Sequence, residues 1–129
     1  MILLDTDVAI EYLKNNHLLV SKVTSLPEKY LSVISIAELY YGAFYSPTFV
    51  KPIEGLKAFL LGVHILTLDY KSCIYFGKIK SELRKKGKII GDFDITIASI
   101  AMAHRFVLWT NNTKHYKNIT GLRLENPLN

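Results

Sequence analysis

An apolar run that stops in two acids limits the possible folds of this chain more than any other stretch. The residues Ile2–Leu4 are continuously apolar rather than alternating, which is typical of a strand buried on both faces of a parallel sheet. Asp5 would then lie at the carboxyl end of this strand, where open parallel sheets bind ligands. Asp7 is placed to cap a helix over Val8–Leu13, and capping alone would also account for both acids.

The length of 129 residues predicts a single domain over residues 1–129, because domains of about this size bury an adequate core. The single cysteine, Cys73, excludes an internal disulfide and a cysteine-only metal site, so we expect it to pack in the core. A reducing, cytoplasmic location follows as an expectation. We expect no membrane association, because no signal-peptide pattern and no apolar run of about 18 residues is present.

The charge balance favours a polyanionic partner such as nucleic acid. Lysine and arginine number 16 against 11 aspartates and glutamates, which gives a formal charge of +5. The densest basic run is a candidate for substrate binding and consists of Arg84, Lys85, Lys86 and Lys88. Bases beside the acids Asp92 and Asp94 suit a site that holds phosphates and a cation together. Cations opposing the negative end of a helix dipole explain the run equally well.

Strand and helix patterns alternate along the chain, which predicts an α/β sandwich with a largely parallel central sheet. The expected strands are Ile2–Leu4, Tyr30–Ile34, His64–Leu68 and Phe106–Thr110, with an edge strand at Leu122 and Leu124. The expected helices span residues 8–13, 18–26, 36–45, 53–61 and 70–86, and a nearly all-apolar one runs from a cap at Asp92 to about residue 104.

Capping residues and prolines set the expected helix boundaries. Ser35 and Glu38 match the capping box of a helix that starts at Ile36. Asp69 is expected to cap the helix that follows the third strand. The prolines Pro47 and Pro52 are expected to break the chain before the helix that starts at residue 53.

Acids recur where strands pass into helices. Asp5, Glu38 and Asp94 each lie at such a transition or in a first helical turn, with Asp7 and Asp92 beside them. Parallel strands would bring these turns to one edge, where the carboxylates would repel one another unless a cation neutralised them. Oxygen ligands favour a hard ion such as Mg²⁺ or Mn²⁺. Each acid also has a simpler explanation as a capping or dipole-favoured residue.

The order and spacing of four motifs resemble those of PIN-domain ribonucleases, and specifically VapC-type toxins of type II toxin–antitoxin systems. The motifs are Leu3–Asp7, Ser35–Gly42, Gly91–Ala98 and Trp109–Asn112, the last followed by Gly121 and Leu122. The resemblance implies a PIN-like three-layer α/β/α sandwich with a largely parallel central sheet. It also implies Mg²⁺-dependent hydrolysis of RNA, with Mn²⁺ as an alternative ion.

The same resemblance assigns roles to residues. Asp5, Glu38 and Asp94 match the catalytic acids, and Asp5 and Asp94 match metal ligands. Glu38 would orient or deprotonate the attacking water, or act from the outer shell of the metal. Family members often have a fourth acid at the position of Asn112, and its replacement by asparagine puts the binding of a second cation in doubt. Family members also usually have an asparagine at the position of Asp7. The expected supporting residues are Asp7, Asp92, Thr110 and Asn112.

The resemblance further implies a homodimer and a VapB-like antitoxin. Helices 36–45 and 53–61 are the expected clamp for an antitoxin segment, and an arginine of that segment would pair with the catalytic acids. The aromatic residues between Tyr40 and Tyr45 exceed what one core-facing stripe needs, so part of this cluster is expected to reach an interface.

Two other functions remain open from the residues alone. Asp5-Thr6-Asp7 after an apolar strand also resembles the nucleophile motif of haloacid dehalogenase-like phosphatases and phosphotransferases, although nothing in that superfamily requires Glu38. A catalytically degenerate nucleic-acid-binding module is kept open by Asn112. The four histidines show no ligand spacing and are expected to be surface or core residues: His17, His64, His104 and His115.

Overall fold

The computed structural model describes residues 1–129, and its centre is a sheet of five parallel strands in the order β3-β2-β1-β4-β5. The strands are β1 (Ile2–Leu4), β2 (Tyr30–Ser32), β3 (His64–Leu66), β4 (Val107–Trp109) and β5 (Leu124–Glu125). The expected edge strand is present as β5, which includes Leu124 but not Leu122, and the largely parallel sheet is confirmed.

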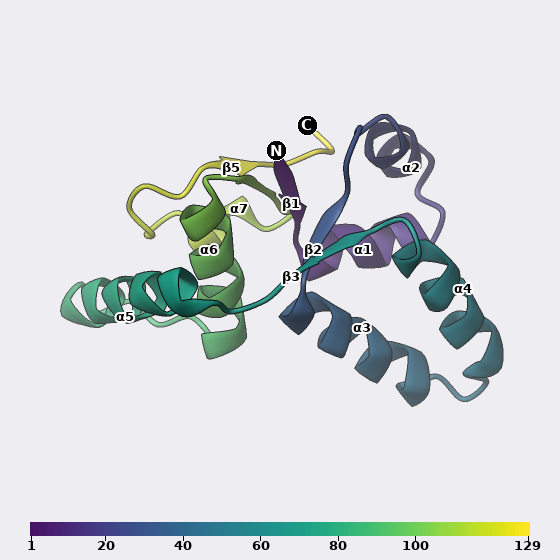
Figure 1. Cartoon of the computed structure of the whole chain (residues 1–129), viewed down its shortest axis with the longest axis horizontal. Coiled ribbons are helices and arrows are strands. Elements are labelled where there is room, and N and C mark those ends of the chain that lie inside the picture. The colour runs from purple at the N-terminus through teal and green to yellow at the C-terminus, as the bar shows by residue number, and fades with distance from the viewer.

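Helices cover both faces of the sheet (Figure 1). The helices of one side are α1 (Thr6–Leu13), α2 (His17–Thr24), α3 (Val33–Tyr45) and α4 (Val50–Leu60). Those of the other side are α5 (Tyr70–Lys85), α6 (Asp92–His104) and α7 (Thr113–Tyr116). None of the helices combines the length and the apolar character needed to cross a membrane.

The central strand β1 divides the hydrophobic core into two halves. Successive strand residues point to opposite faces of a sheet. Leu3 packs with Ile100 and other residues of the α5–α6 side, whereas Leu4 packs with Val8 and Leu31 on the α1–α4 side. Both leucines are fully buried, so the continuous apolar run predicts this three-layer α/β/α sandwich correctly.

Helix α6 is buried along most of its length, as its nearly all-apolar sequence predicts. Its two internal hydroxyls are satisfied by carbonyls one turn earlier: Thr96 Oγ1 donates to Asp92 O at 2.7 Å and Ser99 Oγ donates to Ile95 O at 2.6 Å. The helix therefore passes through the core with its polar groups paired, and its first turn carries Asp94 at the carboxyl edge of the sheet.

Three capping predictions are wrong, and one is confirmed. Helix α3 begins at Val33, because Ser32 Oγ accepts from the Ser35 amide at 3.1 Å. The predicted box of Ser35 with Glu38 therefore does not form, and residues 33–34 are helical rather than part of β2. The cap of α1 is Asp5 rather than Asp7, and that of α6 is Gly91 rather than Asp92. Asp69 caps α5 as expected.

Two further predictions need correction. Helix α4 starts at Val50, so Pro52 lies inside its first turn, where a missing amide proton costs nothing because it has no acceptor within the helix. Cys73 is exposed rather than packed in the core. The buried stripe of α5 follows Ser72, Ile79 and Leu83, and Cys73 points to the side of that stripe.

Candidate metal centre

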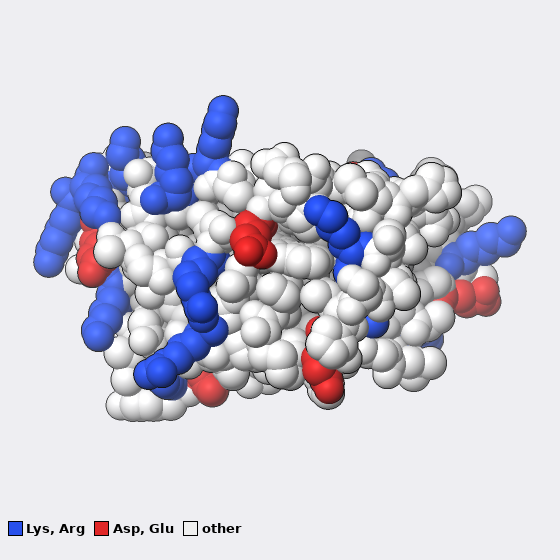
Figure 2. Space-filling view, turned by 90° about the horizontal axis from the view of Figure 1, so that it is seen from above, with Lys and Arg blue, Asp and Glu red and all other residues white.

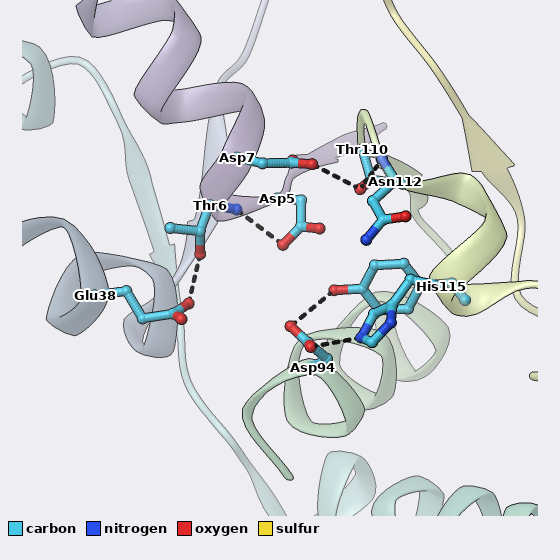
Figure 3. A network of polar contacts seen from close by, with 9 residues as sticks. Asp5, Thr6, Asp7, Glu38, Asp94, Thr110, Asn112 and His115 are labelled. Atoms are coloured by element: carbon cyan, nitrogen blue, oxygen red, sulfur yellow. Dashed lines mark hydrogen bonds and ion pairs between the residues drawn. The ribbon is translucent and has the colours of Figure 1, made fainter. Parts of the chain in front are cut away.

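A hollow of about 380 Å³ lies at the carboxyl end of β1, between α1, the second turn of α3, the first turn of α6, and α7 with the loop before it. The residues that line this acidic hollow are Asp5, Thr6, Asp7, Ile10, Glu38, Asp94, Asn112, His115 and Tyr116. Figure 3 shows the side chains of Asp5, Glu38 and Asp94 converging on it from three separate elements. The sheet topology thus brings together the three acids predicted to be catalytic.

Asp5 is the most buried of the acids, with 6% of its surface exposed. Its amide donates to Trp109 O at 2.9 Å, and its Oδ1 accepts from the Thr6 amide at 2.8 Å. Burial, together with the negative charge of Asp7, raises the pKa of Asp5 from 3.8 to about 6. This carboxylate is fixed in position and is costly to keep ionised without a nearby cation.

Asp7 joins α1 to the loop after β4. Its Oδ2 accepts from the Asn111 amide at 3.0 Å and from Thr110 Oγ1 at 3.3 Å. Its Oδ1 is buried and has no hydrogen-bond partner within the chain. Burial raises the pKa of Asp7, and the charge of Asp94 raises it further. An unpartnered buried oxygen on an acid of this kind suits a cation or a polarised water.

Glu38 lies at the end of a row of hydroxyls that the sequence did not predict. Thr6 Oγ1 donates to Glu38 Oε1 at 2.6 Å and lies 2.8 Å from Ser35 Oγ. Ser32 Oγ is in turn 3.3 Å from Ser35 Oγ. Because each hydroxyl has one proton, the row is fully satisfied when every proton points toward Glu38. The row holds one carboxylate oxygen of Glu38 in place.

Asp94 contacts two residues of α7. Its Oδ2 lies 2.8 Å from His115 Nε2, and its Oδ1 accepts from the Tyr116 hydroxyl at 3.3 Å. Burial, followed by the charges of Asp5 and Asp94, raises the pKa of Tyr116, so this hydroxyl keeps its proton and acts as a donor. His115, expected to be a surface or core residue, belongs to the hollow instead.

Thr110 and Asn112 occupy the loop between β4 and α7. The Thr110 hydroxyl is buried, donates to Asp7 and accepts from the Asn112 amide at 3.1 Å. It therefore shapes the loop and holds Asp7. The Asn112 side chain makes no capping bond to α7 and lines the hollow, where it can offer an oxygen without charge.

Other predicted residues lie outside the hollow. Asp92 is exposed and forms an ion pair with Lys80, with Nζ 2.9 Å from Oδ1. Arg84 and Lys88 line a second hollow of about 350 Å³. Lys86 points away from it and donates to Asn118 O and Thr120 Oγ1. Lys85 is exposed at the end of α5 and lines neither hollow.

The donors around the acidic hollow fit a divalent cation. No three Asp, Glu, His or Cys side chains of the structure lie close enough together to hold a metal ion. Glu38 is bonded to Thr6, and Asp94 to His115 and Tyr116. The donor set is nevertheless rich in carboxylate oxygens, two of the acids have raised pKa values, and one buried oxygen is unpartnered. A bound cation would offset the repulsion between the carboxylates, lower their raised pKa values and give the unpartnered oxygen a ligand contact.

Comparisons with known proteins agree on one family. The family model described as "PIN domain" matches residues 2–120. "Ribonuclease VapC2" from Haemophilus influenzae is 37% identical over 126 residues and is matched over 96% of each chain. The "tRNA(fMet)-specific endonuclease VapC" from Shigella flexneri is 29% identical over 131 residues and is matched over 95% of each chain.

Solved structures give the same result. The crystal structure of VapBC2 from Rickettsia felis, bound to a DNA fragment from their promoter, superposes with a TM-score of 0.92 at 34% identity and covers 98% of both chains. The structure of VapBC-1 from nontypeable Haemophilus influenzae has a TM-score of 0.89 at 32% identity and covers 100% of both chains.

Proposed function

The chain belongs to the PIN-domain family, as its motifs predict, and from this membership we propose that it is a VapC-type, metal-dependent endoribonuclease and the toxin of a toxin–antitoxin pair. The observation that supports this most strongly is the convergence of Asp5, Asp7, Glu38 and Asp94 on one hollow at the carboxyl edge of the sheet. Glu38 is part of this group, although the alternative phosphotransferase chemistry has no use for it.

Mg²⁺ or Mn²⁺ is the proposed cofactor, and Asp5 and Asp94 are the residues that would hold it. When bound, such an ion polarises water and offsets the charge that builds on the scissile phosphate. Asp5 is held for this task by the Thr6 amide, and Asp94 by the Tyr116 hydroxyl. Asp7 adds negative charge beside Asp5 and accepts from the Asn111 amide of the β4–α7 loop.

Glu38 is the proposed group that receives or orients the proton of the attacking water. One of its oxygens is fixed by Thr6, and the row of hydroxyls behind it supports the negative charge. Glu38 also lines the hollow. A base held in this way meets the geometric need of general base catalysis, which is a carboxylate of fixed orientation within reach of the substrate.

Part of the basic run contacts RNA phosphates in this proposal. Lysine and arginine side chains gather at the end of the molecule that α5 forms (Figure 2). Arg84, Lys88 and Lys80 line the second hollow together with Ile95, the neighbour of Asp94 in the first turn of α6. An RNA strand that has one phosphate in the acidic hollow can therefore place a neighbouring nucleotide against the lysine and arginine side chains of the second hollow.

The proposed partners are a VapB-like antitoxin and a second copy of the chain. A groove of about 570 Å³ between α1, α3 and α4 includes Glu38 in its lining, so a peptide segment bound there would reach the acids. Tyr41, Phe44, Tyr45 and Phe49 are exposed near the tip of the α3–α4 pair, and they support an interface at this end. The proposed location is the cytoplasm, which an RNA substrate supports.

The test is cleavage of small structured RNAs by the purified protein after chelation and after adding back Mg²⁺ or Mn²⁺. Cleavage should need the metal and should disappear in Asp5→Asn, which keeps an oxygen acceptor for the Thr6 amide. A protein that binds RNA and never cleaves it would instead be the degenerate binding module that Asn112 keeps open. Trapping of Asp5 by a phosphoryl mimic such as beryllofluoride would favour the phosphotransferase.

A further inference from the structure

The imidazole of His115 faces the acidic hollow, and no role described above uses it. Its Nε2 lies 2.8 Å from Asp94 Oδ2, and the two side chains are 34% and 33% exposed. The ring contacts Tyr116 edge-on at 5.4 Å between centroids, and Tyr116 is itself only 1% exposed. A buried neighbour thus holds a nitrogen donor beside a carboxylate that is a proposed metal ligand.

The spacing of these two donors fits a shared cation. Ligands at adjacent corners of an octahedron, with bonds of about 2.1 Å, stand about 3 Å apart. The distance of 2.8 Å between His115 Nε2 and Asp94 Oδ2 is close to this edge length. A hydrogen bond has the same length, so the distance allows both arrangements.

The chemistry around the hollow favours the shared cation. Asn112, just before α7, offers a carbonyl oxygen without charge. One oxygen of Asp7 already accepts from the Asn111 amide and the Thr110 hydroxyl. Fewer anionic oxygens weaken the hold on Mg²⁺, which takes hard oxygen ligands. A neutral imidazole adds affinity for transition metals, in the order Mn²⁺ below Co²⁺.

We propose that His115 is a nitrogen ligand of the divalent cation, next to Asp94, and that it makes the site select transition metals over Mg²⁺. This inference rests on the metal site of the proposed function and specifies that the ligands of the cation include one nitrogen as well as oxygens. The other three histidines cannot substitute. His17 is exposed at the start of α2, His64 pairs with Glu28, and His104 bonds Ile100 O at 2.9 Å.

The test uses the full chain without a histidine tag, freed of metal by chelation. Mg²⁺, Mn²⁺ and Co²⁺ are titrated by calorimetry into wild type, His115→Gln and the control His17→Gln. Wild type and the control should bind Co²⁺ most tightly and Mg²⁺ least. His115→Gln should lose about tenfold in Mn²⁺ affinity and more for Co²⁺, while its Mg²⁺ affinity stays within about twofold.

Pulsed electron paramagnetic resonance of the Mn²⁺ complexes gives a direct reading of the ligand. Wild type and His17→Gln should show the nitrogen coupling of a bound imidazole, and His115→Gln should not. A wild-type spectrum without this coupling, or an equal loss of affinity for all three ions, would mean that His115 only hydrogen-bonds Asp94. Absence of any metal binding would overturn both this inference and the metal site. Nitrogen coupling without RNA cleavage in either Mg²⁺ or Mn²⁺ would leave the ligand assigned and refute the ribonuclease.

Discussion

Replacing the buried Asp5 with asparagine should stabilise the metal-free protein at neutral pH while removing its activity. Burial raises the pKa of Asp5 from 3.8 to about 6, and each pKa step of one is worth about 1.4 kcal/mol. The ionised carboxylate therefore costs the folded state up to about 3 kcal/mol at pH 7. Asparagine keeps an oxygen for the Thr6 amide, so about 1–3 kcal/mol should be recovered on substitution.

The pH dependence of this difference follows from the raised pKa. At about pH 3 and below, well under the unfolded pKa of 3.8, Asp5 is protonated in both the folded and the unfolded chain, so wild type and Asp5→Asn should be similar in stability. As pH rises from about 4 to 6 the unfolded chain ionises first, and wild type should lose stability relative to the variant. Above about pH 6 the difference should be constant.

Urea denaturation in a chelator, followed from about pH 3 to pH 8, measures this difference. Adding Mn²⁺ at about 100 times its Kd should then stabilise wild type by about 2.7 kcal/mol and leave Asp5→Asn nearly unchanged. The exposed Asp92 supplies the control, since Asp92→Asn should shift stability by less than about 1 kcal/mol at any of these pH values. A variant Asp5→Asn that is less stable than wild type at pH 7 in chelator would refute the reasoning.

Three further predictions concern the metal, the substrate and the partners. Asn112→Asp should tighten Mg²⁺ binding several-fold in calorimetry, because it adds an anionic oxygen to the hollow; unchanged affinity and stoichiometry would show that Asn112 does not face the ion. The double variant Arg84→Gln, Lys88→Gln should raise KM for RNA with little change in kcat. The slope of log Kd against log salt concentration should fall by the equivalent of about two phosphate contacts. An unchanged slope would show that RNA does not contact the second hollow. Phe44→Glu with Tyr45→Glu should weaken dimerisation or antitoxin binding, measured by light scattering and pull-down, because both rings are exposed near the tip of α3–α4; full retention of both would count against an interface there.

The strand pattern of the sequence is enough to predict the sheet, but local capping rules misplaced the helix starts. Val33 and Ile34 are β-branched and extend the strand pattern of β2. In the structure they are helical, because the Ser32 hydroxyl caps the helix three residues before the predicted box. Two serines three residues apart offered two starts for one helix, and the sequence alone gave no reason to prefer the earlier one.

The acids of the site are predictable from strand ends and helix starts, whereas the contact between α6 and α7 is not. Asp5 and Glu38 are predictable because each comes shortly after a parallel strand, and such strands bring their carboxyl ends to one edge. Asp94 is predictable from its place in the first turn of an apolar helix and from its motif. The contact of His115 with Asp94 joins helices α7 and α6 across 21 residues, and no helical or strand spacing encodes it. The sequence partly predicts that the residues of the basic run point in different directions. Lys86 lies about half a helical turn from Arg84, so the two side chains leave the helix on different sides.

The rate of RNA cleavage by Asp94→Asn beside Asp92→Asn tests the central claim most directly. The two acids are two residues apart in the first turn of α6, but only Asp94 lines the acidic hollow, whereas Asp92 is exposed and paired with Lys80. With saturating Mg²⁺ or Mn²⁺, Asp94→Asn should show no cleavage above the chelator background, and Asp92→Asn should cleave within about twofold of wild type. Cleavage by Asp94→Asn at near wild-type rate, or equal loss in both variants, would contradict the assignment of the acidic hollow as the catalytic metal site.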